Sequence, residues 1–136
     1  MTIEEISNTL PNGFHDAYIR RLSINYVTRE AAFALEVCIG NSESEDASKR
    51  DEYKQGRLKL EGLLYFVIEP PDIPLPEDNI LEESELWITD DSTDFYELKS
   101  YPKLPELNKG FRHWFFISNY NSFIYVAAMN ASFEWE

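Results

Sequence analysis

The sequence is poor in cysteine and histidine, and it has no long apolar run. Its 136 residues include a single cysteine, Cys38, so no disulfide can form within the chain, as is usual for proteins of a reducing compartment. No stretch approaches the roughly 18 apolar residues of a membrane-spanning helix, and the acidic start lacks the basic region of a signal peptide. These absences predict a soluble, cytoplasmic protein.

Basic side chains are also scarce, with 12 Lys and Arg against 25 Asp and Glu and a formal net charge of -13. Nucleic-acid binding depends on clustered Lys and Arg that neutralise phosphates, and attraction to an anionic membrane surface needs the same side chains. The composition therefore excludes nucleic acid and membrane as favoured partners.

Apolar and aromatic residues are plentiful despite this acidity. They make up 43% and 15% of the chain, far more than a disordered acidic segment carries. A chain of this length is typical of one domain with one core. We therefore expect residues 1–136 to form a single folded domain.

The apolar pattern predicts mainly β-structure preceded by a short helix. Thr2 and Glu5 have the spacing of a capping box, and Pro11 ends the helix, which we expect over residues 3–10. Alternation of apolar and polar residues predicts strands over 17–27, 31–39, 57–69, 85–89, 112–118 and 123–136. This content indicates an α+β protein that is mainly β, built as a curled antiparallel sheet or a two-layer sandwich.

Three finer features concern the strands and the segments between them. Ile19 is out of phase with Leu22, which indicates a β-bulge near Arg20 and Arg21. Residues 40–56 are polar, and this composition predicts a loop with at most one helical turn. The strand over 57–69 is apolar on both faces in its second half, which is typical of the middle of a sheet.

His15 and Asp16 form an adjacent pair of the kind used by metal-dependent phosphohydrolases. Such sites need further ligands, and the only other histidine is His113, so the sequence predicts no metal and no cofactor. The simpler interpretation is that Asp16 caps the turn after Pro11 and that His15 makes one hydrogen bond. The alternative is a ligand-binding or catalytic pocket in the curled sheet, near His15, Asp16, His113 and Trp114.

Other candidates for catalysis or metal binding are weaker. Cys38 lies within a predicted strand, where a buried and inert thiol is the expected state, and no serine has a glycine-rich elbow around it. Asp90, Ser92 and Asp94 have the spacing of a calcium loop, but Phe95 stands where that loop requires glycine. We interpret residues 90–94 as a solvated acidic turn, and the sequence does not favour an enzyme.

The charge is concentrated in one part of the chain. Residues 69–99 contain eleven acids and one base, a net of -10, whereas the remaining 14 acids and 11 bases contribute -3. Acidic surfaces steer and hold basic proteins, although net charge also serves solubility alone. We therefore predict a non-enzymatic interaction module for a basic protein partner, through Glu77, Asp78, Glu82, Glu83, Glu85, Asp90, Asp91 and Asp94. The oligomeric state is left open.

Three segments carry a resemblance that spans nearly the whole chain. They read Leu-Pro-Asn-Gly-Phe-His-Asp-Ala at 10–17, Leu-Leu-Tyr-Phe-Val-Ile-Glu-Pro-Pro-Asp within 56–72, and Trp-Phe-Phe-Ile-Ser-Asn-Tyr-Asn-Ser-Phe-Ile at 114–124. Together they resemble a family of small uncharacterised bacterial proteins, a resemblance that implies no catalytic or binding residue. A looser, compositional likeness is to the immunity proteins of bacterial toxin systems, which implies a role as an acidic antagonist of a basic partner.

Overall fold

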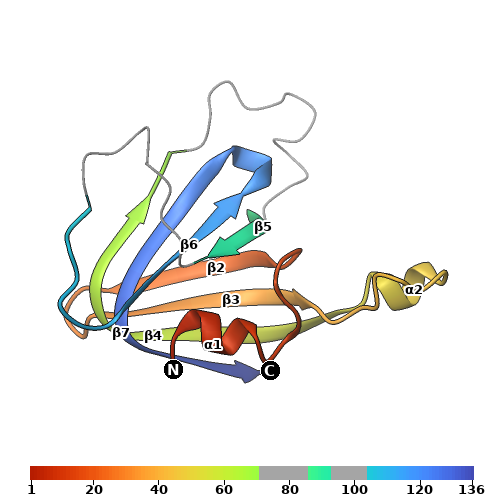
Figure 1. Ribbon diagram of the computed structural model, residues 1–136, viewed down its shortest axis with the longest axis horizontal. Coiled ribbons are helices and arrows are strands. Elements are labelled where there is room, and N and C mark those ends of the chain that lie inside the picture. Colours follow the sequence, from red (N-terminus) through yellow and green to blue (C-terminus); the bar gives the residue numbers. More distant parts are fainter. Residues whose placement is uncertain (71–85, 93–103) are drawn as a thin grey trace.

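The computed structural model describes residues 1–70, 86–92 and 104–136 of the chain. Six antiparallel strands form a closed barrel in the order β2-β3-β4-β7-β6-β5 (Figure 1). The predicted class is confirmed, because the protein is mainly β with a short N-terminal helix, and the sheet curls until it closes. In chain order the elements are α1 (Ile3–Ser7), β1 (Pro11–Phe14), β2 (Tyr18–Asn25), β3 (Glu30–Cys38), α2 (Ala47–Arg50), β4 (Tyr53–Ile68), β5 (Leu86–Ser92), β6 (Phe111–Ile117), η1 (Ser118–Tyr120) and β7 (Ser122–Trp135).

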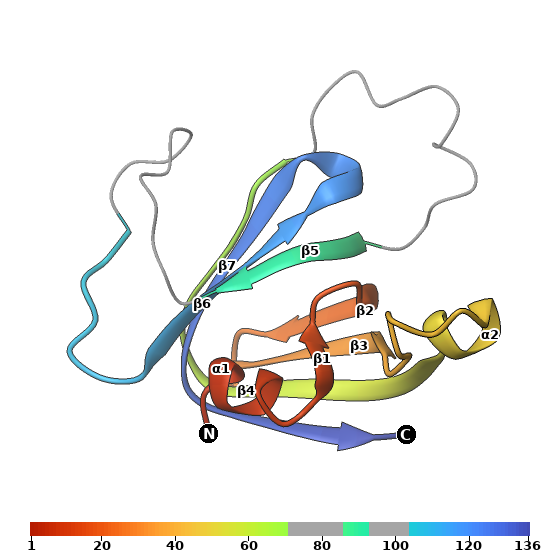
Figure 2. The same cartoon turned by 45° about the vertical axis from the view of Figure 1, so that its right-hand side comes forward.

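The sheet closes because its two longest strands bend. β4 and β7 pair along most of their length, with a register shift between Leu63 and Tyr65. Just before this bulge Gly62 has a φ of +64°, in the left-handed region where glycine carries no steric penalty. One half of β4 pairs with β3, and part of β7 pairs with β6, so the bent strands join the two halves of the sheet (Figure 2). β4 is thus a central strand, as its apolar pattern predicts.

A short seam between β2 and β5 completes the barrel. Tyr18 lies opposite Trp87 and Ile19 opposite Leu86. Two further backbone bonds continue the seam, from the Ile88 N–H to the Ala17 carbonyl at 2.8 Å and from the Asp16 N–H to the Ile88 carbonyl at 2.9 Å. The register of β2 against β3 shifts between Ile19 and Arg21, which confirms the bulge predicted there.

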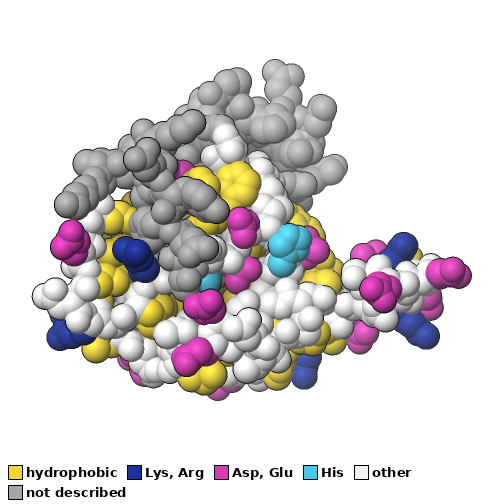
Figure 3. Space-filling view, viewed as in Figure 1, with side chains coloured by type: hydrophobic (Ala, Val, Ile, Leu, Met, Phe, Trp, Pro, Cys, Tyr) yellow, Lys and Arg dark blue, Asp and Glu magenta, His cyan; other side chains and the backbone are white. Residues whose placement is uncertain are grey.

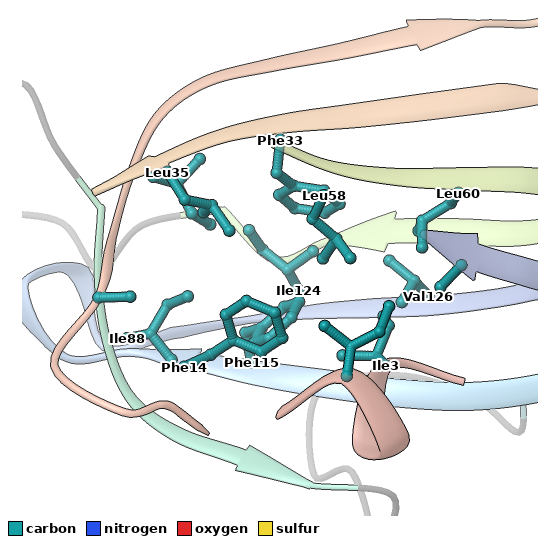
Figure 4. Close-up of a cluster of buried hydrophobic side chains, with 14 of the residues drawn as sticks. Ile3, Phe14, Phe33, Leu35, Leu58, Leu60, Ile88, Phe115, Ile124 and Val126 are labelled. Carbon is teal, nitrogen blue, oxygen red and sulfur yellow. The ribbon is translucent and has the colours of Figure 1, made fainter. Parts of the chain in front are cut away.

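Phenylalanine side chains fill the centre of the barrel. Phe115 meets Phe14 and Phe33 edge to face, with ring centroids 6.0 and 5.8 Å apart. All three side chains are buried, and Figure 4 shows them with aliphatic side chains from β3, β4, β5 and β7. Edge-to-face pairs of this kind contribute about 0.5–1.5 kcal/mol beyond the area that they bury. The core therefore requires β1, β3 and β6 to converge at one place.

The N-terminal helix docks on this core. Its capping box is confirmed, because the Glu5 N–H donates to Thr2 Oγ1 at 3.1 Å and the Thr2 N–H donates to Glu5 Oε2 at 2.7 Å. This bond from the Thr2 N–H lowers the pKa of the exposed Glu5 carboxyl. Ile3 and Ile6 are buried, and α1 lies beside β1 and β7 (Figures 1 and 2). The helix ends at Ser7, three residues before the predicted end.

Several predicted boundaries differ from the structure. The fourth strand begins at Tyr53 rather than at residue 57, and α2 supplies the one helical turn expected in the preceding loop. Residues 90–92 belong to β5, so the prediction of a solvated acidic turn is wrong for them. Pairing with β6 extends that strand, and sequence alternation does not report such a partner. Within the described segments, no helix is long and apolar enough to cross a membrane.

The capping box generates a stability prediction. We expect Thr2→Ala to lower the free energy of unfolding by about 1 kcal/mol, because it removes the acceptor of the Glu5 N–H. Thr2→Ser keeps a hydroxyl at this position and should stay close to the wild type. Urea unfolding of the three proteins measures the difference, and equal stabilities would show that another group takes over the cap.

Candidate functional site

A polar cleft of about 470 Å³ opens between α1, the segment after it, and the ends of β5 and β6. In Figure 3, acidic side chains lie near the histidines around the middle of the face that carries α1. Hydroxyl, amide, carboxylate and imidazole groups dominate the lining, so the cleft is suited to a polar ligand. Its described lining residues are Glu4, Ser7, Asn8, Leu10, Asn12, Gly13, Asp91, Ser92 and His113.

A bulge in β5 turns the carboxylate of Asp91 into the barrel. The register of β5 against β6 shifts between Ile88 and Asp90, and Asp91 then lies opposite the core residue Phe115. Cross-strand neighbours share a face of the sheet, so Asp91 lies on the inner face and the exposed Asp90 on the outer one. Without the bulge, residues would alternate strictly between the two faces from the buried Ile88 onward. Asp90 would then lie on the inner face and Asp91 on the outer one.

His113 is the most buried polar side chain of the cleft, with 1% of its surface exposed. It lies on the inner face of β6, and its ring centroid is 4.9 Å from that of Phe115. Neither ring nitrogen has a hydrogen-bond partner in the part of the chain that the structure describes. Among the described residues, the charged group beside it is Asp91, whose Oδ2 is 3.7 Å from Nε2, beyond hydrogen-bond range.

Ser7 holds the Asp91 carboxylate by a hydrogen bond. Its Oγ donates to Asp91 Oδ2 at 3.0 Å, which joins the last residue of α1 to β5. Gly13 permits this approach, because a Cβ there would lie 2.6 Å from Ser7 Oγ, and its φ is +57°. The Asn12 amide donates to the carbonyls of Cys38 and Gly40 and so fixes the β1 segment against the end of β3. The segment 10–13 thus builds one wall of the cleft.

This arrangement of Ser7, Asp91 and His113 is not a nucleophilic triad. In a triad the serine bonds to the histidine that removes its proton, whereas here the serine bonds to the carboxylate. The geometry can orient a charge and offer hydrogen bonds, but it does not activate the hydroxyl. Nowhere in the described ranges do three His, Cys, Asp or Glu side chains stand close enough to hold a metal ion.

A second hollow of about 500 Å³ lies beside the barrel seam. His15 Nδ1 and Asp16 Oδ2 are 3.2 Å apart there, and both side chains are more than half exposed. Asp16 adopts a φ of +63° in the turn between β1 and β2, a conformation that aspartate tolerates better than most residues. Burial, and then charge at Cys38 and Asp16, raises the pKa of Tyr53 to about 12. The other lining residues are Asn12, Gly40, Ser42, Arg50 and Asp51.

The structure therefore divides the predicted pocket residues between two sites. His113 lines the polar cleft, whereas His15 and Asp16 line the second hollow, and Asn12 borders both. Trp114 follows His113 on β6, faces the opposite side of the sheet, and packs on Phe123 at a ring distance of 5.2 Å. Cys38 is buried, as expected, with 8% exposed.

The predicted acidic surface is described at two of its eight positions, which lie on opposite faces of β5. Asp91 faces the cleft, and Asp90 faces outward. Glu69, the first acid of the charged segment, is buried, and its carboxylate accepts a hydrogen bond from the Phe123 N–H at 3.0 Å, so it extends the sheet. The remaining positions lie outside the described residues: Glu77, Asp78, Glu82, Glu83, Glu85 and Asp94.

The sequence reasoning missed the cleft residues contributed by α1 and by the chain after it. Ser7 and Asn8 sit at the end of a short helix, where polar residues are common and carry no functional signal. Asn12 and Gly13 read as turn residues. The sequence signal that could have indicated this part of the cleft is Gly13, directly after Asn12. A glycine can adopt a left-handed backbone conformation and permits other groups to approach closely. Only the docking of α1 on the barrel shows which groups approach.

The chain was compared with protein-family models, curated proteins and solved structures, and no match was found in any of them. The site is therefore interpreted from its own geometry.

The environment of Tyr53 generates a prediction for alkaline pH. The folded protein keeps the Tyr53 proton until about pH 12, whereas the phenol of the unfolded chain releases it near pH 10. Unfolding is then favoured by proton release, so the stability contributed by Tyr53 is present below pH 10 and is lost as the pH rises towards 12. Urea unfolding across this window, with absorbance at the phenolate band, measures both effects.

Tyr53→Phe should reduce the late part of the phenolate titration and lessen the loss of stability over this window. Tyr26→Phe, at a fully solvated position of the β2–β3 turn, is the matched control and should leave the late titration in place. A late titration of unchanged amplitude in Tyr53→Phe would assign it to another tyrosine.

Proposed function

We propose that the protein is a non-enzymatic binding module that holds a polar ligand in the cleft between α1 and β5. The observation that carries this proposal is His113, a buried imidazole that borders the cleft and whose nitrogens have no partner in the described part of the chain. Buried polar groups are nearly always paired in native proteins, and an unpaired one costs about 1–3 kcal/mol. A ligand that hydrogen-bonds to the His113 nitrogens would recover that energy on binding.

The walls of the cleft support recognition rather than catalysis. Ser7 orients Asp91, and Asn12 and Gly13 belong to a segment anchored to the end of β3, so the polar groups are held before a ligand arrives. Preorganised groups lose little freedom on binding and therefore favour affinity. Nucleophilic catalysis needs an activated hydroxyl and metal-assisted catalysis needs a ligand cluster, and neither the Ser7 geometry nor the described metal-ligating side chains supplies one.

Filling the cleft tests this function. Asn8 is exposed at the end of α1 and lines the cleft, so Asn8→Trp should occlude it without disturbing the core. Amide chemical shifts are followed by NMR while n-butylammonium, butyrate, glucose and inorganic phosphate are added as probes. We expect at least one probe to shift the signals of Ser7, Ser92 and His113 in the wild type, and Asn8→Trp to reduce its affinity at least about tenfold.

The control is Ser48→Trp, which adds the same side chain on the exposed helix α2, away from the cleft. It should bind the probe as the wild type does. The proposal fails if no probe shifts the cleft residues, or if both tryptophan variants weaken binding equally. Thermal unfolding of the two variants verifies that each is folded.

The concentration of charge favours a second candidate, an acidic module that binds a basic protein. Residues 69–99 hold -10 of the net -13, and the exposed Asp90 on β5 presents part of that charge to solvent. Such a surface raises the association rate of a basic partner in a salt-dependent way. The likeness to immunity proteins points to the same class of partner, an antagonised basic toxin in the cytoplasm.

Charge reversal tests the second candidate. The variant Glu82→Lys, Glu83→Lys, Glu85→Lys should lose a basic partner that the wild type retains from the native cytoplasm. The control reverses three exposed acids elsewhere, Glu43→Lys, Glu45→Lys, Asp51→Lys, and so changes the net charge equally. Retention of the partner by the first variant, or its loss from both, would contradict a specific acidic surface.

A further inference from the structure

The charged groups of the cleft are of one sign. Glu4 and Asp91 contribute carboxylates, and no Lys or Arg is among the described residues that line it. Glu4 is exposed at the first turn of α1, whereas the Asp91 side chain is only 14% exposed. The two carboxylates reach the same space from the helix and from the barrel. A ligand that enters the cleft therefore meets negative charge on two sides.

Asp91 is a half-buried carboxylate without a permanently cationic partner among the described residues. Its Oδ2 accepts a hydrogen bond from the Ser7 hydroxyl at 3.0 Å and lies 3.7 Å from His113 Nε2. A carboxylate taken out of water is costly unless a counter-charge accompanies it. Burial also lowers the local dielectric, so a cation bound there is held more strongly than at an exposed acid. The second oxygen, Oδ1, remains to accept hydrogen bonds.

His113 gives an independent indication of the same ligand chemistry. A neutral imidazole has one nitrogen that accepts a hydrogen bond, and both nitrogens of His113 lack a partner in the described part of the chain. Its Nε2 lies beside the Asp91 carboxylate, so the cleft can present two kinds of acceptor close together. A ligand group that fits two neighbouring acceptors, one of them negatively charged, carries several N–H donors and a positive charge.

From these observations we infer that the cleft is a cation site for an alkylammonium or guanidinium group, with Asp91 as the counter-charge. This inference rests on the proposed ligand-binding function and names its ligand class. Both groups carry several N–H donors, and a guanidinium pairs with a carboxylate through two parallel bonds. A volume of about 470 Å³ accommodates the carbon chain attached to the charged group as well.

Such a cation reaches the cleft either as a free small molecule or as a lysine or arginine side chain of another protein. The chemistry at Asp91 is the same in both cases. The two sources differ in what surrounds the cation, because a side chain brings neighbouring peptide that can contact Glu4 and Asn8 at the exposed rim.

Asp91 and Asp90 provide a matched pair for the test. They are neighbours on β5, carry the same charge, and lie on opposite faces of the sheet, so Asp91→Asn and Asp90→Asn change the long-range field equally. The dissociation constants of n-butylammonium and ethylguanidinium are measured by NMR titration. We expect Asp91→Asn to weaken both cations at least about tenfold and Asp90→Asn to weaken them less than about twofold.

The histidine rings give a second readout within the same titration. The ring ¹⁵N signals of His113 should move on binding, because the cation enters beside Asp91, whereas those of the exposed His15 should stay in place. If Asp91→Asn does not fold, Glu4→Gln on the exposed side of α1 replaces it, and it should weaken the cations about two- to threefold. A capped Gly-Arg-Gly peptide that binds more tightly than ethylguanidinium would identify a protein side chain as the source.

Each failure has a separate meaning. If the neutral alcohol n-butanol or the anion butyrate binds the cleft as well as the cations do, the inference is wrong and the proposed ligand-binding function stands. Equal weakening by Asp91→Asn and Asp90→Asn shows diffuse attraction by net charge and also overturns the inference. If no probe of any charge shifts the cleft residues, both the inference and the proposed function fail.

Discussion

The closure of the barrel between β2 and β5 is the constraint on which the rest of the structure depends. The two strands share only a short seam, in which the backbone of Ile88 pairs with Asp16 and Ala17 beside the Tyr18–Trp87 contact. An unpaired backbone group in a buried sheet is costly, so these few bonds, together with the pairing of β5 to β6, hold β5 in place. β5 in turn carries Asp91 to the cleft and Trp87 to within a ring distance of 6.4 Å of Tyr53, which lines the second hollow. The position of β5 therefore affects both hollows.

The polar cleft lies at the edge of a core that is otherwise apolar. Phe115 packs on Phe14 and Phe33 in the barrel centre, and two residues before it on β6 the inner face carries His113 instead of a hydrocarbon. A buried imidazole is tolerated where the core meets a polar wall, and the Ser7–Asp91 bond supplies that wall. Burial and polarity thus occur together at this end of the barrel, a combination that favours selective recognition, because a mismatched ligand leaves buried groups unpaired.

The two proposals use negative charge at different residues and over different distances. The charged segment 69–99 attracts a cation over a long range, but salt at 0.1 M screens this attraction beyond about 10 Å. The cleft provides short-range geometry around one half-buried carboxylate, which salt screens much less. A cationic ligand or a basic protein would be attracted by the first and held by the second. The proposed ligand-binding function and the acidic interaction surface are therefore compatible within one molecule.

The sequence by itself determined the fold class, the capping box of α1, the bulge near Arg20 and the central place of β4, because each follows from local alternation or spacing along the chain. It also showed that the negative charge is concentrated, since charge adds without reference to structure. Only the tertiary structure decided the site. The bulge after Ile88 reverses the face of Asp91, and the docking of α1 brings Ser7 to that carboxylate across 84 positions of sequence. His15 and His113 look like one pair of rare residues in the sequence, yet they line different hollows. The reason is physical: strand pairing and helix docking are long-range contacts, and local patterns do not encode which distant residues they join.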